Sequence, residues 1–188
     1  MTVEKKGLAM WIPRFFLLTI LGATTILNYI KADMNTDDIK TVPQLDLERY
    51  AGTWYEIARF PHRFERGLVN VTATYTQLPD GKIEVVNRGR KESTDGEESI
   101  ASGKAWLPDP NEPGRLKVSF FWIFASDYKV FVLDEDYQYA MVTSSSKKYL
   151  WILARTPTLD EAIYQQLLQT ARDNGFDLSQ IIKVPQDW

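Results

Sequence analysis

Between residues 53 and 155 the chain repeats one pattern, a short run of strand-forming residues followed by a turn signal. The runs are rich in β-branched and aromatic side chains, and the turns carry Pro, Gly, Asp or Ser. We place eight runs at 53–60, 69–78, 82–90, 99–107, 115–123, 128–134, 137–143 and 148–155. Many short, evenly spaced strands are typical of a sandwich or a barrel. Since eight antiparallel strands can close around one small ligand and leave no open edge, we predict an all-β fold, an eight-stranded antiparallel up-and-down β-barrel.

One helix is expected after the last run. Thr158-Leu159-Asp160-Glu161 matches a capping box, in which the Thr158 hydroxyl caps the helix and Glu161 reaches back. Apolar residues then recur at helical spacing until Asn174-Gly175, which supplies a stop. The narrow apolar stripe predicts that this C-terminal helix packs on the outside of the barrel. Residues 176–184 would then return as a short extra strand.

The N-terminus has the pattern of an export signal. Residues 15–30 carry no charge and follow Lys5, Lys6 and Arg14. We predict that residues 1–33 are a signal peptide, or alternatively a signal anchor, because the apolar part is slightly short for a membrane span. Positive charge before the segment places the remainder outside the cytoplasm. Residues 34–44 are expected to form a linker, and residues 45–188 the folded domain.

Composition excludes several classes of function. The net charge is −3 with no basic stripe, so we expect no nucleic-acid partner. The sequence has no cysteine, which excludes thiol catalysis, thiolate metal sites, disulfides and lipid attachment at a cysteine. His62 is the single histidine and is interpreted as a loop residue, which excludes a histidine triad or a multi-histidine metal site. We therefore expect no metal, no cofactor and no catalytic residue.

Side chains alternate across a strand, so one anchor residue per strand sets which face points inward. With Trp54, Trp106 and Arg155 as anchors, the predicted lining is apolar and suits an elongated apolar ligand with one polar end. Among the few polar side chains, Lys104 pairs with Glu56 or meets a ligand carboxylate or phosphate, and the sequence leaves both open. The predicted ligand-binding residues are Ala58, Phe60, Ala73, Tyr75, Val85, Lys104, Trp106, Val118, Phe120, Val130, Val132, Val142, Tyr149 and Trp151.

Phe121 and Trp122 end a strand with aromatic side chains. If Phe120 points inward, Phe121 points outward, and an exposed aromatic cluster indicates a homodimer or membrane contact. The alternative is that these rings pack beneath a loop or the helix.

The motifs that carry a family likeness are Gly52-Thr53-Trp54, the turn residues Asp134, Asp136 and Tyr137, and Arg155 at the end of the last run. In this order and at these separations they resemble the three signatures of the lipocalins. The extended form Gly-Thr-Trp-Tyr-Glu-Ile-Ala-Arg at 52–59 resembles the bacterial outer-membrane lipoprotein and apolipoprotein D-like branch. The likeness covers about residues 45 to 185.

The resemblance implies a calyx whose closed end is formed by Gly52, Trp54 and Arg155, with Arg155 stacked over Trp54. It also implies a non-enzymatic protein that binds, stores or transports fatty acids or lysophospholipids for envelope maintenance. Proteins of this branch usually carry a lipid on a cysteine, which is absent here. The chain would be periplasmic, or attached to an envelope membrane only through residues 15–30. Two alternatives remain open: an enzymatic lipocalin using Glu56, and a structural or interaction module using Phe121 and Trp122.

Overall fold

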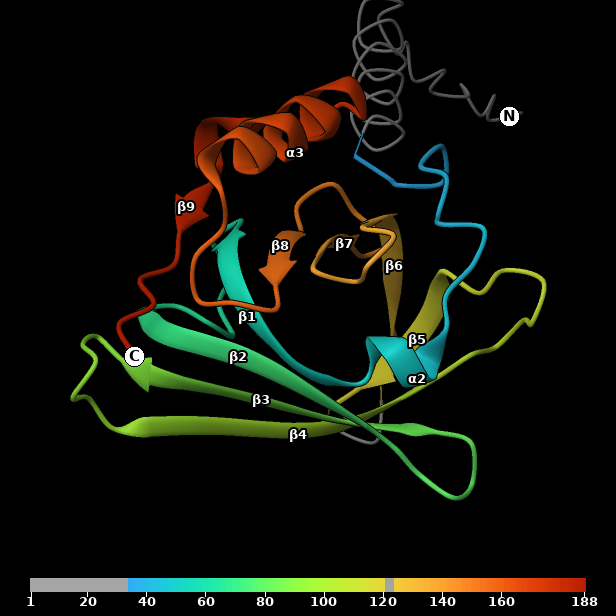
Figure 1. The fold of residues 1–188 in the computed structure, drawn as a ribbon, viewed down its shortest axis with the longest axis horizontal. Helices are drawn as coiled ribbons and strands as arrows, with labels where there is room; N and C mark the ends of the chain where they lie inside the picture. Colours follow the sequence, from blue (N-terminus) through green and yellow to red (C-terminus); the bar gives the residue numbers. More distant parts are fainter. Residues whose placement is uncertain (1–33, 121–123) are drawn as a thin grey trace, which may run out of the picture. The chain divides into compact units, whose positions relative to one another are not determined.

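Eight strands form a closed barrel in the computed structural model, which describes residues 34–120 and 124–188 (Figure 1). Each strand pairs antiparallel with the next, and β1 pairs with both β2 and β8, which closes the sheet. This confirms the predicted eight-stranded up-and-down barrel. The strands are β1 (Gly52–Arg59), β2 (Leu68–Gln77), β3 (Ile83–Lys91), β4 (Glu98–Trp106), β5 (Arg115–Ser119), β6 (Ser126–Leu133), β7 (Tyr139–Thr143) and β8 (Leu150–Ala154).

The two ends of the barrel differ. The short helix α2 (Leu47–Tyr50) precedes β1, so that it lies at the end where β1 begins, which we call the floor. Asp46 caps α2 by accepting hydrogen bonds from the backbone N–H groups of Glu48 and Arg49. Because neighbouring strands are antiparallel, the loop 60–67 after β1 lies at the opposite end, which we call the mouth.

Helix α3 (Glu161–Asp173) packs on the outer wall of the barrel, as predicted (Figure 1). Its buried side chains belong to an outer hydrophobic cluster that also contains residues of β1, β7 and β8. The predicted capping residue was wrong, because Asp160, and not Thr158, accepts hydrogen bonds from the N–H groups of Ala162 and Ile163. A carboxylate at this position also interacts favourably with the positive end of the helix dipole, which a hydroxyl does less well.

The chain after α3 returns to the barrel and pairs with β1. Strand β9 (Ile182–Lys183) lies beside Ala58 and Arg59 of β1, after a 3-10 turn at Leu178–Gln180. Strands β1 and β2 pair only over residues 52–55 and 72–75. Beyond that stretch the C-terminal segment bridges them: the Val184 N–H donates to the Ile57 carbonyl, and Asn70 N–H donates to Pro185. The expected extra strand therefore fills the seam where the barrel wall opens.

Residues 35–44, which belong to the predicted linker 34–44, lie against the barrel. The Lys129 ammonium, which is buried, donates to the backbone carbonyl of Thr36 at 3.0 Å and to its hydroxyl at 2.9 Å. The Val42 N–H donates to the Val130 carbonyl at 2.9 Å. The predicted signal or anchor at 1–33 lies outside the described residues, as do Phe121 and Trp122. Within the described part of the chain no helix combines the length and apolar character that a membrane span requires.

Candidate ligand-binding site

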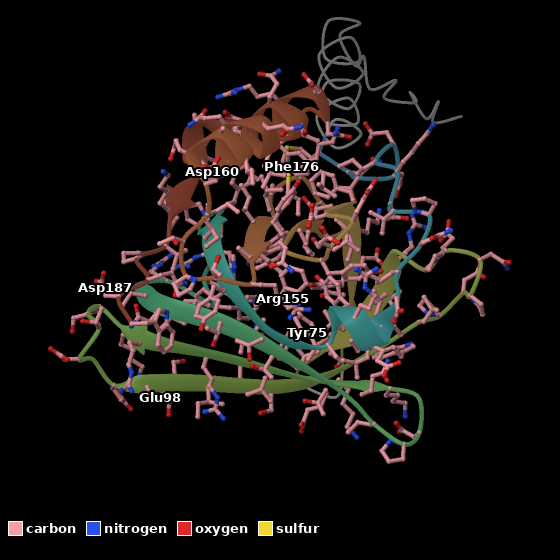
Figure 2. The ribbon with its side chains drawn as sticks, in the orientation of Figure 1. Tyr75, Glu98, Arg155, Asp160, Phe176 and Asp187 are labelled. Carbon is pink, nitrogen blue, oxygen red and sulfur yellow. The ribbon has the colours of Figure 1, made fainter. Side chains whose placement is uncertain are left out.

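The floor of the barrel is built around Trp54, which is fully buried. The Arg155 guanidinium carbon lies 3.9 Å from the centroid of the Trp54 ring, and the Trp54 Nε1–H donates to the Tyr50 carbonyl at 2.8 Å. Arg155 also donates to the carbonyls of Thr53 and Ala51, both at 2.9 Å. Figure 2 labels the Arg155 side chain. The resulting cation–π contact and hydrogen bonds join the chain before β1 to the end of β8.

The backbone conformation of Gly52 at the floor favours glycine. Its φ is +93°, a conformation that side-chain-bearing residues rarely adopt, and an added Cβ would lie 3.4 Å from Arg155 Nη1. The three expected signature residues, Gly52, Trp54 and Arg155, therefore meet at one place.

The inner wall is an apolar cluster that extends above Trp54. Alternate residues of the strands contribute to it, and the small side chains of Ala73, Ala105 and Ala140 lie among larger ones. Tyr149 stacks on Trp151 towards the mouth, with ring centroids 5.9 Å apart. The predicted lining residues that belong to this cluster are Ala73, Tyr75, Val85, Val118, Phe120, Val130, Val142 and Trp151.

The predicted inward orientation of Ala58 and Phe60 was wrong. A β-bulge in β1 between Glu56 and Ala58 adds one residue to the strand, so alternation from Trp54 fails beyond Glu56. Both side chains lie in the outer cluster with α3, where the Phe60 ring packs edge-on against Phe176 at 6.1 Å.

Val132 was misplaced for the same reason. A second irregularity in β6 between Val130 and Val132 brings Val132 opposite Met141, and both lie in the outer cluster. Val130 keeps its inward position, as does Leu133 on the far side of the irregularity.

In β4 the predicted register was shifted by one residue. Ala105 pairs with Ile83 and with Val118, and all three belong to the inner cluster. Its neighbours Lys104 and Trp106 therefore point outward, and Lys104 is exposed. The large Trp106 ring had been taken as the inward anchor, but it lies on the outer face of the wall. Lys104 consequently cannot pair with Glu56 inside the barrel.

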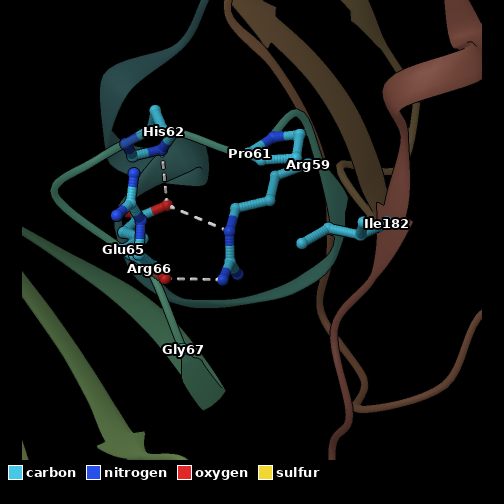
Figure 3. Close-up of a pocket in the computed structure, with 7 residues that line it drawn as sticks. All are labelled: Arg59, Pro61, His62, Glu65, Arg66, Gly67 and Ile182. Atoms are coloured by element: carbon cyan, nitrogen blue, oxygen red, sulfur yellow. Dashed lines mark hydrogen bonds and ion pairs between the residues drawn. The ribbon is translucent and has the colours of Figure 1, made fainter.

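The partner of Glu56 is instead Arg59, which the bulge turns inward. Arg59 Nη2 also donates to the carbonyls of Glu65 at 2.7 Å and Leu68 at 3.1 Å. The Glu65 carboxylate enters the mouth from the loop 60–67, where it lies 2.8 Å from His62 Nε2 (Figure 3). It also accepts a hydrogen bond from the Trp151 indole at 3.3 Å. The mouth therefore holds a buried cluster of charged and polar groups beside a pocket of about 170 Å³.

The two carboxyl groups of the mouth have opposite protonation tendencies. Burial and the charge of Glu65 raise the pKa of Glu56 well above its ordinary value. Burial also acts to raise the pKa of Glu65, but His62 and Arg59 outweigh it, so this pKa is lowered. His62 lies in the loop 60–67, as predicted, and its Nε2 contacts the Glu65 carboxylate at the mouth.

Sequence reasoning missed a row of tyrosine hydroxyls above the floor. Tyr128 OH is hydrogen bonded to Tyr50 OH at 2.7 Å and to Tyr75 OH at 2.8 Å. Burial raises the pKa of all three, so the hydroxyls stay protonated at neutral pH. Tyr50 precedes the first strand in α2, where strand alternation does not apply. The sequence therefore contains no periodic signal that would have placed it in the barrel.

Comparisons with known proteins agree with this geometry. Residues 45–186 match the family model described as a lipocalin-like domain. The chain is 45% identical over 148 residues to the outer membrane lipoprotein Blc of Escherichia coli K12, covering 79% of this chain and 83% of that protein. It is 31% identical over 156 residues to apolipoprotein D of Mus musculus, covering 75% and 77% of the two chains.

A solved structure shows the same fold at lower identity. Insecticyanin from the tobacco hornworm Manduca sexta superposes with a TM-score of 0.64 at 22% identity, covering 80% of this chain and 84% of that one. The family model, the relatives and the closed barrel lead to one conclusion: the chain belongs to the lipocalin family, whose barrels bind small hydrophobic ligands.

Proposed function

We propose that the barrel binds a long-chain lipid, a fatty acid or a lysophospholipid, and stores or transports it in the cell envelope. The observation that carries this proposal is the apolar inner wall above a floor sealed by Trp54 and Arg155. Such a wall buries an alkyl chain from water, which stabilises the complex by about 0.8 kcal/mol for each buried methylene group.

The contacts of the two buried acids favour binding without catalysis. Glu56 was the cavity acid considered for an enzyme, and its carboxylate is engaged by the Arg59 guanidinium. Glu65 is likewise held by His62 and the Trp151 indole. Both acids are therefore held by neighbouring groups at the mouth of the barrel, and we assign neither of them a chemical step.

Location in the envelope is supported by the similarity to the outer membrane lipoprotein Blc of Escherichia coli. Since this sequence has no cysteine, we propose that any membrane attachment uses residues 15–30, and that a cleaved form is periplasmic. Cell fractionation combined with mass spectrometry of the mature N-terminus tests this. A mature chain that retains residues 15–30 in the membrane fraction supports an anchor, and one that begins after residue 30 in the soluble fraction supports a cleaved signal.

Binding is tested with a pair of matched variants of β3. Val85 is 2% exposed and belongs to the inner cluster, whereas Val86 on the same strand faces outward. After delipidation, the affinity for a fluorescent fatty acid is measured by titration. Val85→Asp should weaken binding by at least about tenfold, because it places an unpaired carboxylate in the lining.

Val86→Asp introduces the same charge on the outer face and should leave the affinity within about twofold. Circular dichroism and melting curves establish that both variants are folded. Equal weakening by the two variants, or none by Val85→Asp, would contradict binding inside the barrel.

A further inference from the structure

The hydroxyls of Tyr50, Tyr128 and Tyr75 form a row and not a ring. Tyr128 OH contacts each of the other two, at 2.7 and 2.8 Å, and there is no hydrogen bond between Tyr50 OH and Tyr75 OH. Among residues 34–120 and 124–188 these hydroxyls have no other hydrogen-bond partner. The row lies in the inner cluster. There the centroid of the Tyr50 ring is 4.9 Å from that of Trp54 and 5.4 Å from that of Tyr75.

The row has more hydroxyl protons than it has hydrogen bonds to use them. Three hydroxyls carry three protons, and two hydrogen bonds use two of them. Whichever way the protons are arranged, one O–H has no acceptor within the row. A buried donor that is left unpaired is unfavourable by about 1–3 kcal/mol, so an acceptor beside the row would stabilise the barrel.

The mouth of the barrel is less favourable than the floor for binding a ligand's carboxyl group. The Arg59 guanidinium faces the buried acids there, and its Nη1 and Nη2 already donate to Glu56, Glu65 and Leu68. The side chains of Glu56 and Glu65 are at most 11% exposed. An incoming carboxylate would meet the buried Glu65 carboxylate, whereas the floor has the positive Arg155 behind Trp54.

We propose that the tyrosine row is the recognition site for the ligand's polar end, and that the ligand enters the barrel with that end first. This inference rests on the proposed lipid-binding function and narrows it. One free donor and the spare lone pairs of the row match a single carboxyl group in its neutral form, which accepts one hydrogen bond and donates one. A phosphodiester headgroup offers several acceptors and a charge that the row cannot satisfy. The preferred ligand is therefore a long-chain fatty acid and not a lysophospholipid.

The orientation is tested by NMR on the wild-type chain with hexadecanoic acid carrying ¹³C at the carboxyl carbon or at the terminal methyl carbon. A soluble gadolinium chelate is added, and the paramagnetic relaxation of each label is measured. The carboxyl label should be protected and the methyl label should relax faster. Stronger relaxation of the carboxyl label would place it at the mouth and overturn the inference.

The recognition role is tested with the triple variant Tyr50→Phe, Tyr75→Phe, Tyr128→Phe. All three hydroxyls must be removed, because any shorter row still retains one free proton. Replacing them by rings of the same shape leaves packing intact, and the variant should bind hexadecanoic acid about two- to tenfold more weakly while its affinity for hexadecane stays unchanged.

Tyr164→Phe is the matched control, since Tyr164 is buried in α3 on the outer wall and should not affect either affinity. Unchanged affinity of the triple variant for the acid would overturn the inference, as would equal weakening for hexadecane. If the triple variant does not fold, the labelled-acid measurement on the wild type still decides. If the wild type binds a lysophospholipid but not the acid, the inference is overturned. If it binds neither hexadecane, the acid nor a lysophospholipid, the proposed function itself is overturned.

Discussion

Truncation of Trp54 to alanine is the sharpest test of the sealed floor. The side chain is fully buried, with the Arg155 guanidinium on one face at 3.9 Å and the Tyr50 ring 4.9 Å away. The lost Nε1 hydrogen bond contributes little, because the Tyr50 carbonyl that accepts it also accepts from Arg155 Nη2 at 3.2 Å. The cavity and the lost apolar contacts therefore dominate, and we expect a loss of about 3–5 kcal/mol in the free energy of unfolding.

The loss is measured by urea denaturation followed by far-ultraviolet circular dichroism, with melting as a second readout. For a chain of this size, about 2–4 °C per kcal/mol corresponds to a decrease in Tm of about 6–20 °C. Trp188→Ala is the control, because Trp188 is 70% exposed and its truncation should change the unfolding free energy by less than about 1 kcal/mol. A loss below about 1 kcal/mol for Trp54→Ala would show that the floor is not sealed by this ring.

Two further predictions concern the helix cap and the mouth. Asp160→Ala should lower the unfolding free energy, measured by urea denaturation, by about 0.5–2 kcal/mol, and Thr158→Ala should lower it by less. A larger loss for Thr158→Ala would show that Thr158, and not Asp160, caps the helix. The pKa of Glu65 is lowered on folding from its ordinary value of 4.5, so the folded state binds fewer protons than the unfolded state. The stabilisation from Glu65 should therefore be present above that value and be lost as the pH falls through the lowered pKa. Urea midpoints from about pH 7 to pH 3 should decline less for Glu65→Gln than for the wild type, and parallel curves would show that His62 and Arg59 do not hold the carboxylate.

Regular alternation was a reliable guide only where the strands are regular. In β3, β5 and β7, and in β2 beyond its irregularity between Val69 and Thr72, alternation places Val85, Val118, Val142 and Tyr75 correctly on the inner face. In β1 and β6 a bulge reverses the faces after Glu56 and after Val130, and a bulge depends on how two strands twist together. In β4 the error had another cause, since a large aromatic residue was assumed to point inward, while the small Ala105 faces the cavity.

The groups that carry the polar chemistry were the least predictable. Glu56 was expected inside, but its partner Arg59 became visible only when the bulge turned that side chain inward. Glu65 and His62 belong to a loop, and Trp151 belongs to β8, far along the chain. Contacts of this kind join residues with no common periodicity, so local sequence patterns cannot place them.

The amino-acid sequence was enough to predict the number of barrel strands and the helix after them, because turn residues and side-chain periodicity act locally along the chain. The meeting of Gly52, Trp54 and Arg155 at the floor was implied by the resemblance of their motifs to the lipocalin signatures. Tertiary structure alone decided which face Ala58, Phe60 and Val132 present, how the C-terminal segment fills the seam between β1 and β2, and that three tyrosine hydroxyls meet above the floor. The physical reason is closure. Joining β1 to β8 sets the register of every strand at once, and that register determines which distant side chains share the cavity.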